Sequence, residues 1–67
     1  MRLIKYLRLE KELTRGQLKE LSGIGFEAIS NAEQGNQKPH KSTLNCLAMA
    51  LGYDGDPADL LKEVEVV

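Results

Sequence analysis

Residues 14–34, TRGQLKELSGIGFEAISNAEQ, predict two short helices joined by a sharp turn. Thr14 and Gln17 have the spacing of a capping box, in which the threonine hydroxyl accepts a hydrogen bond from the amide three residues on and the glutamine reaches back. Gly23 can adopt a positive φ without strain, which a sharp turn between helices needs. The first helix is therefore expected to start after Thr14 and to break at the glycine-rich turn, and the second to span Phe26–Gln34.

The apolar residues of this stretch predict how the two helices pack. Leu18 and Leu21 are expected to be the buried pair of the first helix, and Ile29 and Ala32 the inward residues of the second. Leu18, Ile24 and Ile29 are spaced to hold the second helix against the first. Two short helices joined by a turn that contains glycine make a helix-turn-helix, in which the second helix is held from behind and stands out from the surface.

Two further helices are predicted on either side of this unit. In a helix over about residues 2–11, Leu3, Ile4 and Leu7 share one face and Arg8 lies largely off it. The clearest amphipathic stripe belongs to Lys41–Leu51, where the apolar residues fall at positions i, i+3, i+4 and i+7: Leu44, Leu47, Ala48 and Leu51.

The C-terminal segment predicts a fifth helix. Asp56 suits its N-cap and Pro57 its first helical position. Leu60, Leu61 and Val64 are expected to pack it against the core. Residues 64–67 either fray, extend this helix or pair as a short strand. The whole chain, residues 1–67, is thus expected to form a single all-α domain.

Composition limits the classes of function. The chain has 67 residues, 42% of them apolar and 28% charged, which is typical of a globular protein. Its net charge is −1, yet residues 1–41 carry eight Lys and Arg against five acids, whereas residues 42–67 carry one Lys against five acids. A basic front can bind phosphates whatever the charge of the whole chain.

Chemistry other than binding finds little support in the sequence. Cys46 is the one cysteine, so no internal disulfide or cysteine metal cluster is expected, and a cytoplasmic setting fits. No apolar run is long enough to predict a membrane span. No nucleophile–base pair, phosphate-binding loop or metal-ligand spacing occurs, so neither an enzyme nor a cofactor site is predicted.

In order and spacing, the motifs resemble the Cro/repressor-type (XRE-like) helix-turn-helix family of phage and bacterial transcriptional regulators. The resemblance covers about residues 4–62 and is carried by Leu13-Thr14, Leu18, Leu21, Gly23-Ile24, Ile29-Ser30, Glu33, Gly35, Pro39, Thr43-Leu44, Leu47-Ala48, Ala50-Leu51-Gly52 and Leu60-Leu61. It implies a compact five-helix, lambda-repressor-like domain whose third helix enters the DNA major groove, often as a dimer on a two-fold site. It also implies a structural role for Glu33.

The resemblance further implies which side chains contact DNA. The residues expected to face base edges are Phe26, Glu27, Ala28 and Asn31. Those expected to meet phosphates are Arg15, Gln17, Asn36, Lys38 and Lys41. Asn31 can pair with adenine, and Glu27 can accept from the cytosine amine. Phe26 and Ala28 can contact thymine methyl groups.

A homodimer surface is expected on the outer side of the helix over Lys41–Leu51. Cys46 and Met49 point away from its buried stripe, at positions where similar sequences usually carry charged residues. Tyr53, Val64 and Val66 can extend this apolar patch. In the alternative, the fifth helix and the tail cover the patch within one subunit.

The sequence therefore predicts a sequence-specific DNA-binding regulator of transcription, a repressor-like dimer from a prokaryote or phage. The alternative is a protein-interaction or antitoxin-like module on the same fold, with weak or no DNA binding. Glu27, an exposed Phe26 and a pI near 5.7 favour that alternative.

Overall fold

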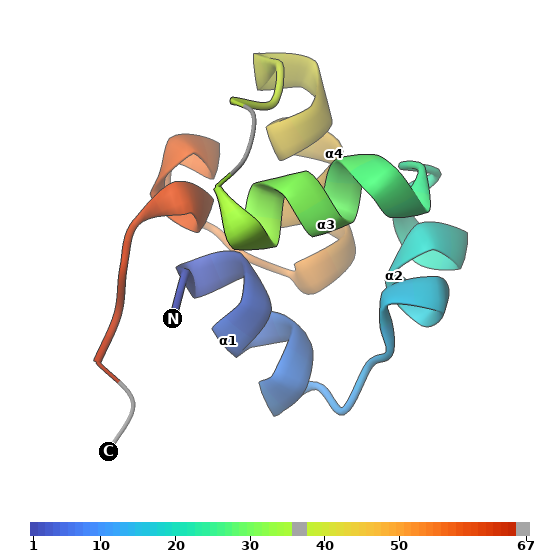
Figure 1. Ribbon diagram of the computed structural model, residues 1–67, viewed down its shortest axis with the longest axis horizontal. Helices are drawn as coiled ribbons and strands as arrows, with labels where there is room; N and C mark the ends of the chain where they lie inside the picture. Colours follow the sequence, from blue (N-terminus) through green and yellow to red (C-terminus); the bar gives the residue numbers. More distant parts are fainter. Residues whose placement is uncertain (36–37, 66–67) are drawn as a thin grey trace.

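In the computed structural model, which describes residues 1–35 and 38–65, the chain folds into four α-helices followed by a short 3₁₀ helix (Figure 1). The elements are α1 (Leu3–Glu10), α2 (Arg15–Ser22), α3 (Phe26–Gln34), α4 (Lys41–Leu51) and η1 (Pro57–Leu61). Within the described ranges there is no strand element, and no helix is long and apolar enough to cross a membrane. The expected all-helical architecture is confirmed.

The start of α2 and the turn between α2 and α3 both form as the sequence predicts. Thr14 Oγ1 accepts a hydrogen bond from Gln17 N at 3.0 Å, and Gln17 Oε1 accepts one from Thr14 N at 2.8 Å, which completes the capping box. Gly23 ends α2 with a φ of 74°, in the left-handed region that side chains other than glycine's rarely adopt. The chain can therefore reverse within three residues and start α3 at Phe26.

The helices surround one aliphatic core. In Figure 1, α3 runs across the front of the molecule with α1 below it and α4 behind it. α4 packs against α2 and η1, and α3 packs against α2 and α1. The buried apolar residues of the described chain are Ile4, Leu18, Ile29, Ala32, Leu44, Leu47, Ala48, Leu51 and Leu60. The predicted stripe of α4 is therefore confirmed.

Two expectations about burial are wrong. Leu21 is 61% exposed, because the position of α2 that turns inward after Leu18 is Ser22. The Ser22 hydroxyl donates to Leu18 O at 2.7 Å and accepts from Ile24 N at 3.1 Å, so it belongs to the turn. Arg8, expected largely off the packed face of α1, is buried with 8% exposure, because it lies one helical turn after Ile4 and meets a buried carboxylate.

The fifth α-helix is not confirmed, since η1 is a 3₁₀ helix of five residues. Asp56 caps it as expected, accepting from Ala58 N at 3.0 Å. The helix stops after Leu61 because the following residues pair with the start of the chain. Leu3 N donates to Lys62 O and Val64 N to Met1 O, both at 2.8 Å. The tail is thus strand-like at residues 62–64, and residues 66–67 lie outside the described chain.

A polar cluster fixes η1 to the loop that follows α4. Tyr53 OH donates to Asp59 Oδ2 at 2.8 Å, and Lys62 Nζ lies 3.0 Å from Asp59 Oδ1. The hydrogen bonds from Lys62 and Tyr53 hold the pKa of Asp59 below its ordinary value, and the bond to Asp59 raises the pKa of Tyr53. The hydroxyl hydrogen of Tyr53 is therefore already donated to a partner within the protein.

Truncating the core is expected to unfold much of so small a domain. Leu47 is completely buried, so Leu47→Ala removes apolar contacts and leaves a cavity, which lowers the free energy of unfolding by about 2–5 kcal/mol. Leu9→Ala, which truncates a leucine that is 46% exposed and lies outside the core, is the matched control and leaves the thermal melt nearly unchanged. Equal melting temperatures for Leu47→Ala and the wild type would contradict the assigned core.

Candidate nucleic-acid interface

The outward side of α3 carries the residues expected to face base edges. Ile29 and Ala32 point into the core, which leaves the opposite side of the helix at the surface. Phe26 is 51% exposed and Glu27 is exposed, while Ala28 and Asn31 are half-buried. The structure therefore places these four side chains where a large ligand can reach α3.

Three of them line a hollow together with the segment that leads into α4. Glu27, Ala28 and Asn31 form one wall, and the other residues of this hollow of about 360 Å³ are Lys38, Pro39, His40 and Thr43. Phe26 does not line it. The fold thus brings Lys38 next to α3, which the sequence could place only by resemblance.

The start of α4 gives this hollow a positive side. α4 begins at Lys41, and its N-cap residue His40 makes no hydrogen bond from its side chain to the first-turn amides. The N-terminus of a helix carries partial positive charge, which favours a nearby anion. Lys38 and Lys41 are exposed on either side of His40. Glu27 is the acidic group among the residues that line the hollow, so the site pairs a carboxylate on α3 with the cation Lys38 on the opposite wall, and Lys41 lies next to that wall in the chain.

The residues expected to meet phosphates at α2 have different surroundings. Gln17 is exposed, but its side-chain oxygen is used in the capping box. The side chain of Arg15 is 28% exposed and is held by α3. Asn36, the remaining expected phosphate contact, lies outside the described residues.

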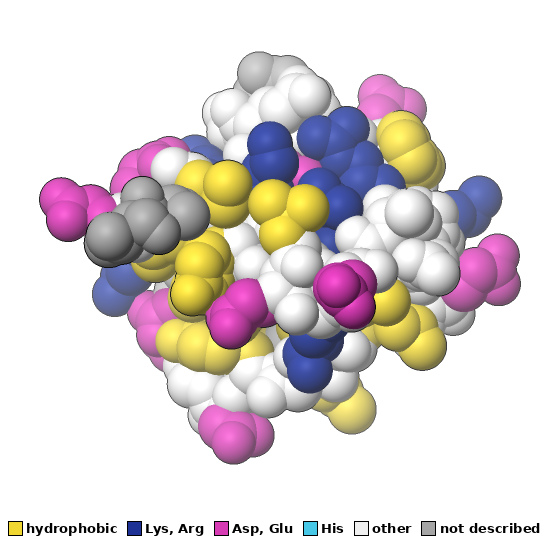
Figure 2. Space-filling model, turned by 90° about the horizontal axis from the view of Figure 1, so that it is seen from below, with side chains coloured by type: hydrophobic (Ala, Val, Ile, Leu, Met, Phe, Trp, Pro, Cys, Tyr) yellow, Lys and Arg dark blue, Asp and Glu magenta, His cyan; other side chains and the backbone are white. Residues whose placement is uncertain are grey.

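Basic side chains gather on the face formed by α1 and the neighbouring edge of α3. Figure 2 shows Lys and Arg side chains clustered around a small acidic patch near the top of this face, with other acidic side chains scattered lower and at the edges. Three arginines approach α3 from this direction. Arg2 Nη1 donates to Ala32 O at 3.3 Å, and Arg8 and Arg15 both reach Glu33.

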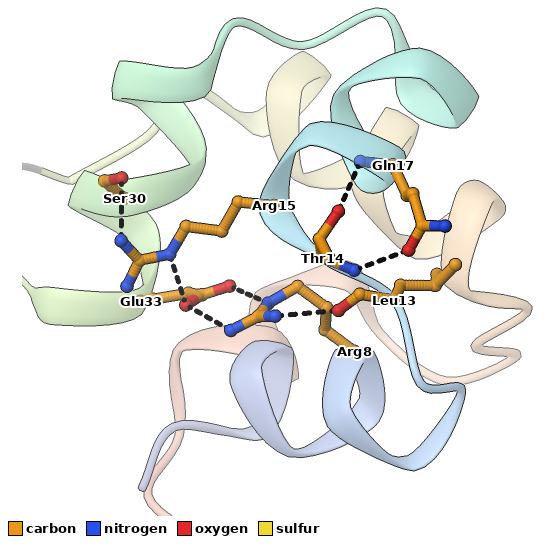
Figure 3. A network of polar contacts seen from close by, with 7 residues as sticks. All are labelled: Arg8, Leu13, Thr14, Arg15, Gln17, Ser30 and Glu33. Carbon is orange, nitrogen blue, oxygen red and sulfur yellow. Dashed lines mark hydrogen bonds and ion pairs between the residues drawn. The ribbon is translucent and has the colours of Figure 1, made fainter.

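Glu33 is the centre of a buried ion network that the residue pattern did not reveal (Figure 3). Its side chain is 1% exposed, and Oε2 accepts from Arg8 Nε at 2.7 Å while Oε1 accepts from Arg8 Nη2 at 3.3 Å. Arg15 Nε donates to Oε1 at 3.2 Å. The network extends through Arg8 Nη1 to Leu13 O at 2.8 Å and through Arg15 Nη1 to Ser30 Oγ at 3.3 Å. α1, α2 and α3 therefore meet at one carboxylate.

The candidate dimer residues lie in two groups. Cys46 and Met49 are exposed and line a second hollow, whose other residues are Leu21, Ser22 and Ala50. Tyr53 and Val64 are half-buried and lie apart from this hollow in the chain. Val66 lies outside the described residues. The exposed apolar patch thus combines α4 with the end of α2, because Leu21 points outward.

Comparison with known protein families gives one finding. Residues 4–57, most of the 67-residue chain, match the family described as Helix-turn-helix. The matched range begins at the second residue of α1, contains α2 to α4 in full and ends at the first residue of η1. No curated protein and no solved structure was matched.

Breaking the buried ion network is expected to be costly. Arg8→Ala removes both of the bonds that Arg8 makes to Glu33, and leaving a buried charge short of a partner lowers the free energy of unfolding by about 3–5 kcal/mol. The double variant Arg8→Met/Glu33→Leu replaces the pair by apolar groups and is expected to recover most of this loss. Lys5→Ala in the same helix controls for the loss of a cation. Urea unfolding gives these values, and an Arg8→Ala midpoint equal to that of the wild type would contradict the network.

Proposed function

Because the chain belongs to the helix-turn-helix family, we propose that it is a sequence-specific, repressor-like regulator of transcription that places α3 in the major groove of DNA. The observation that carries the proposal is the hollow beside α3. There, polar and small side chains of α3 face the cationic start of α4, which is the arrangement needed to contact base edges and phosphates at once.

The side chains of α3 define the kind of base sequence that fits. Asn31 suits an adenine, to which an amide can bond in two places, and Glu27 suits the amine of a cytosine. Ala28 and exposed Phe26 suit thymine methyl groups. α3 contains no Lys or Arg, so it offers no cation to the two acceptors of guanine. We therefore propose that the DNA sites bound by this protein present few guanines to α3 in the major groove.

The affinity comes from phosphate contacts on both sides of α3. Lys38 and Lys41 are exposed beside the hollow, and Arg15 and Gln17 lie at the start of α2. Asn36 belongs to the same proposed set. Such contacts fix how the domain lies on the duplex but carry little sequence information. A domain anchored in this way in a prokaryotic or phage system, in the cytoplasm, represses by occupying its site.

We further propose that two copies bind together through the apolar patch of Leu21, Cys46 and Met49. Met49 is 82% exposed and Leu21 is 61% exposed, which is costly for large apolar side chains side by side on one surface. A two-fold dimer of this domain matches the two-fold sites to which helix-turn-helix proteins bind. Tyr53, Val64 and Val66 are further candidates for the same interface.

A second function has its own supporting observation. Phe26 is half exposed at the first position of α3 and Glu27 follows it, so the same surface could bind a protein, as in an antitoxin-like module. In that case Phe26→Ala abolishes binding of the protein partner. DNA binding by the wild type at low salt distinguishes the two functions, because the module would bind a duplex weakly or not at all.

Base contacts and phosphate contacts are expected to respond differently to mutation. On a site selected from random DNA, Asn31→Ala is expected to cost about 1–3 kcal/mol and to relax the preference at one base pair. Lys41→Ala is expected to weaken all duplexes alike and to reduce the slope of log K against log salt by about one. Fluorescence anisotropy at several salt concentrations measures both effects.

Asn45→Ala is the matched control for Asn31→Ala, since it removes an exposed amide from α4 and is expected to leave affinity unchanged. If Asn31→Ala binds every duplex as the wild type does, α3 does not contact the bases.

Self-association is expected to depend on the apolar patch. Met49→Lys places a charge in the middle of the proposed interface and should shift sedimentation from dimer towards monomer at micromolar to millimolar concentration. Leu9→Lys changes another exposed apolar residue, on α1, and serves as the control. A wild type that stays monomeric both free and on DNA would eliminate the proposed dimer.

A further inference from the structure

Arg15 is held in an unusual place for a cation. It is the first residue of α2, where the positive end of the helix repels a positive side chain. A long exposed arginine at such a position would normally be directed into water. Instead its guanidinium crosses from α2 to α3, where Nε donates to Glu33 Oε1 at 3.2 Å and Nη1 donates to Ser30 Oγ at 3.3 Å (Figure 3).

The charges of this network do not balance. One carboxylate, Glu33, lies between two guanidinium groups, so the three side chains together carry one excess positive charge. Arg8 makes the shorter contact to Glu33, and its side chain is 9% exposed, against 28% for Arg15. The excess charge is therefore accessible at Arg15, on the outer side of the network.

The two bonds of Arg15 leave donors for a ligand. A guanidinium has five N–H donors, and the contacts to Glu33 and Ser30 are made by Nε and Nη1. Arginine can bind a phosphate through two parallel N–H groups when its plane is suitably oriented. Ordering a flexible side chain beforehand removes part of the entropic cost of binding.

We propose that Glu33 and Ser30 act as positioning residues, which orient the guanidinium of Arg15 in the free protein for one phosphate of the DNA backbone. The proposal rests on the proposed function. Glu33 itself is buried and touches no DNA. Arg15 would then contribute to DNA affinity through the shape of its guanidinium as well as through its charge, whereas Lys38 and Lys41 would contribute through charge alone.

The test uses a mixed-sequence 20-base-pair duplex, fluorescence anisotropy and several salt concentrations. Arg15→Ala is expected to weaken binding and to lower the salt slope by about one. Arg15→Lys keeps the charge and is expected to keep the slope, yet to bind about 3–10-fold more weakly, because an ammonium cannot reproduce the fork. Ser30→Ala is expected to weaken binding about threefold.

The control is a double-mutant cycle. In the Arg15→Ala background, Ser30→Ala is expected to have no further effect, because Ser30 acts only through Arg15. Ser30→Ala carries no change of charge and leaves the Arg8–Glu33 pair intact, so the fold is expected to persist and thermal melts confirm it. In the free wild type, the Nε–H signal of Arg15 is expected to be protected from hydrogen exchange in nuclear magnetic resonance spectra, and less protected in Ser30→Ala.

Three results would overturn the positioning roles while DNA binding stands. These are wild-type affinity in Arg15→Lys, equal effects of Ser30→Ala in both backgrounds, and an unprotected Arg15 Nε–H in the free protein. A wild type that does not bind the duplex even at low salt would overturn the proposed function and this inference together.

Discussion

The buried carboxylate of Glu33 constrains the whole front of the molecule. An ionised group that is 1% exposed is tolerated only with partners, and its partners come from α1 and α2. Apolar packing is nondirectional and would allow these helices to slide by small amounts. Hydrogen bonds of 2.7 and 3.2 Å to two guanidinium groups restrict the angle and position of α3 much more tightly. The orientation of the surface helix is thus determined by charge as well as by the aliphatic core.

This constraint links the stability of the fold to the surface proposed to bind DNA. Ile29 and Ala32 attach α3 to the core, and the next residue, Glu33, attaches it to Arg8 and Arg15. The outward side of the same helix carries Glu27 and Asn31. A change beneath α3 would therefore move the groups above it. The shape of the hollow depends on the position of α3 and on that of the segment that leads into α4, because these two parts of the chain form its opposite walls.

Local signals in the sequence predicted the helices well, since they act over a few residues. The capping box of Thr14 and Gln17, the turn at Gly23 and the apolar stripe of α4 are all formed as expected. Contacts between distant residues could not be obtained in this way. The burial of Arg8 depends on Glu33, 25 residues later. The outward direction of Leu21 has a local cause that the apolar spacing did not indicate, since hydrogen bonds to Leu18 and from Ile24 draw Ser22 into the turn. The predicted contacts of α3 with DNA rested on resemblance, and the structure adds the hollow that gathers three of them.

The pairing between residues 1–3 and 62–64 has a consequence for how the chain assembles. Most contacts of a small helical domain join residues close in sequence and form quickly. The hydrogen bonds from Leu3 N to Lys62 O and from Val64 N to Met1 O close a loop that contains nearly the entire chain. Closing such a loop has a large entropic cost until the intervening helices are folded. The two strand-like ends should therefore join late in folding and separate early in unfolding. Amide hydrogens in these ends should then exchange through a local opening, whereas those of α4 should exchange only when the whole domain unfolds.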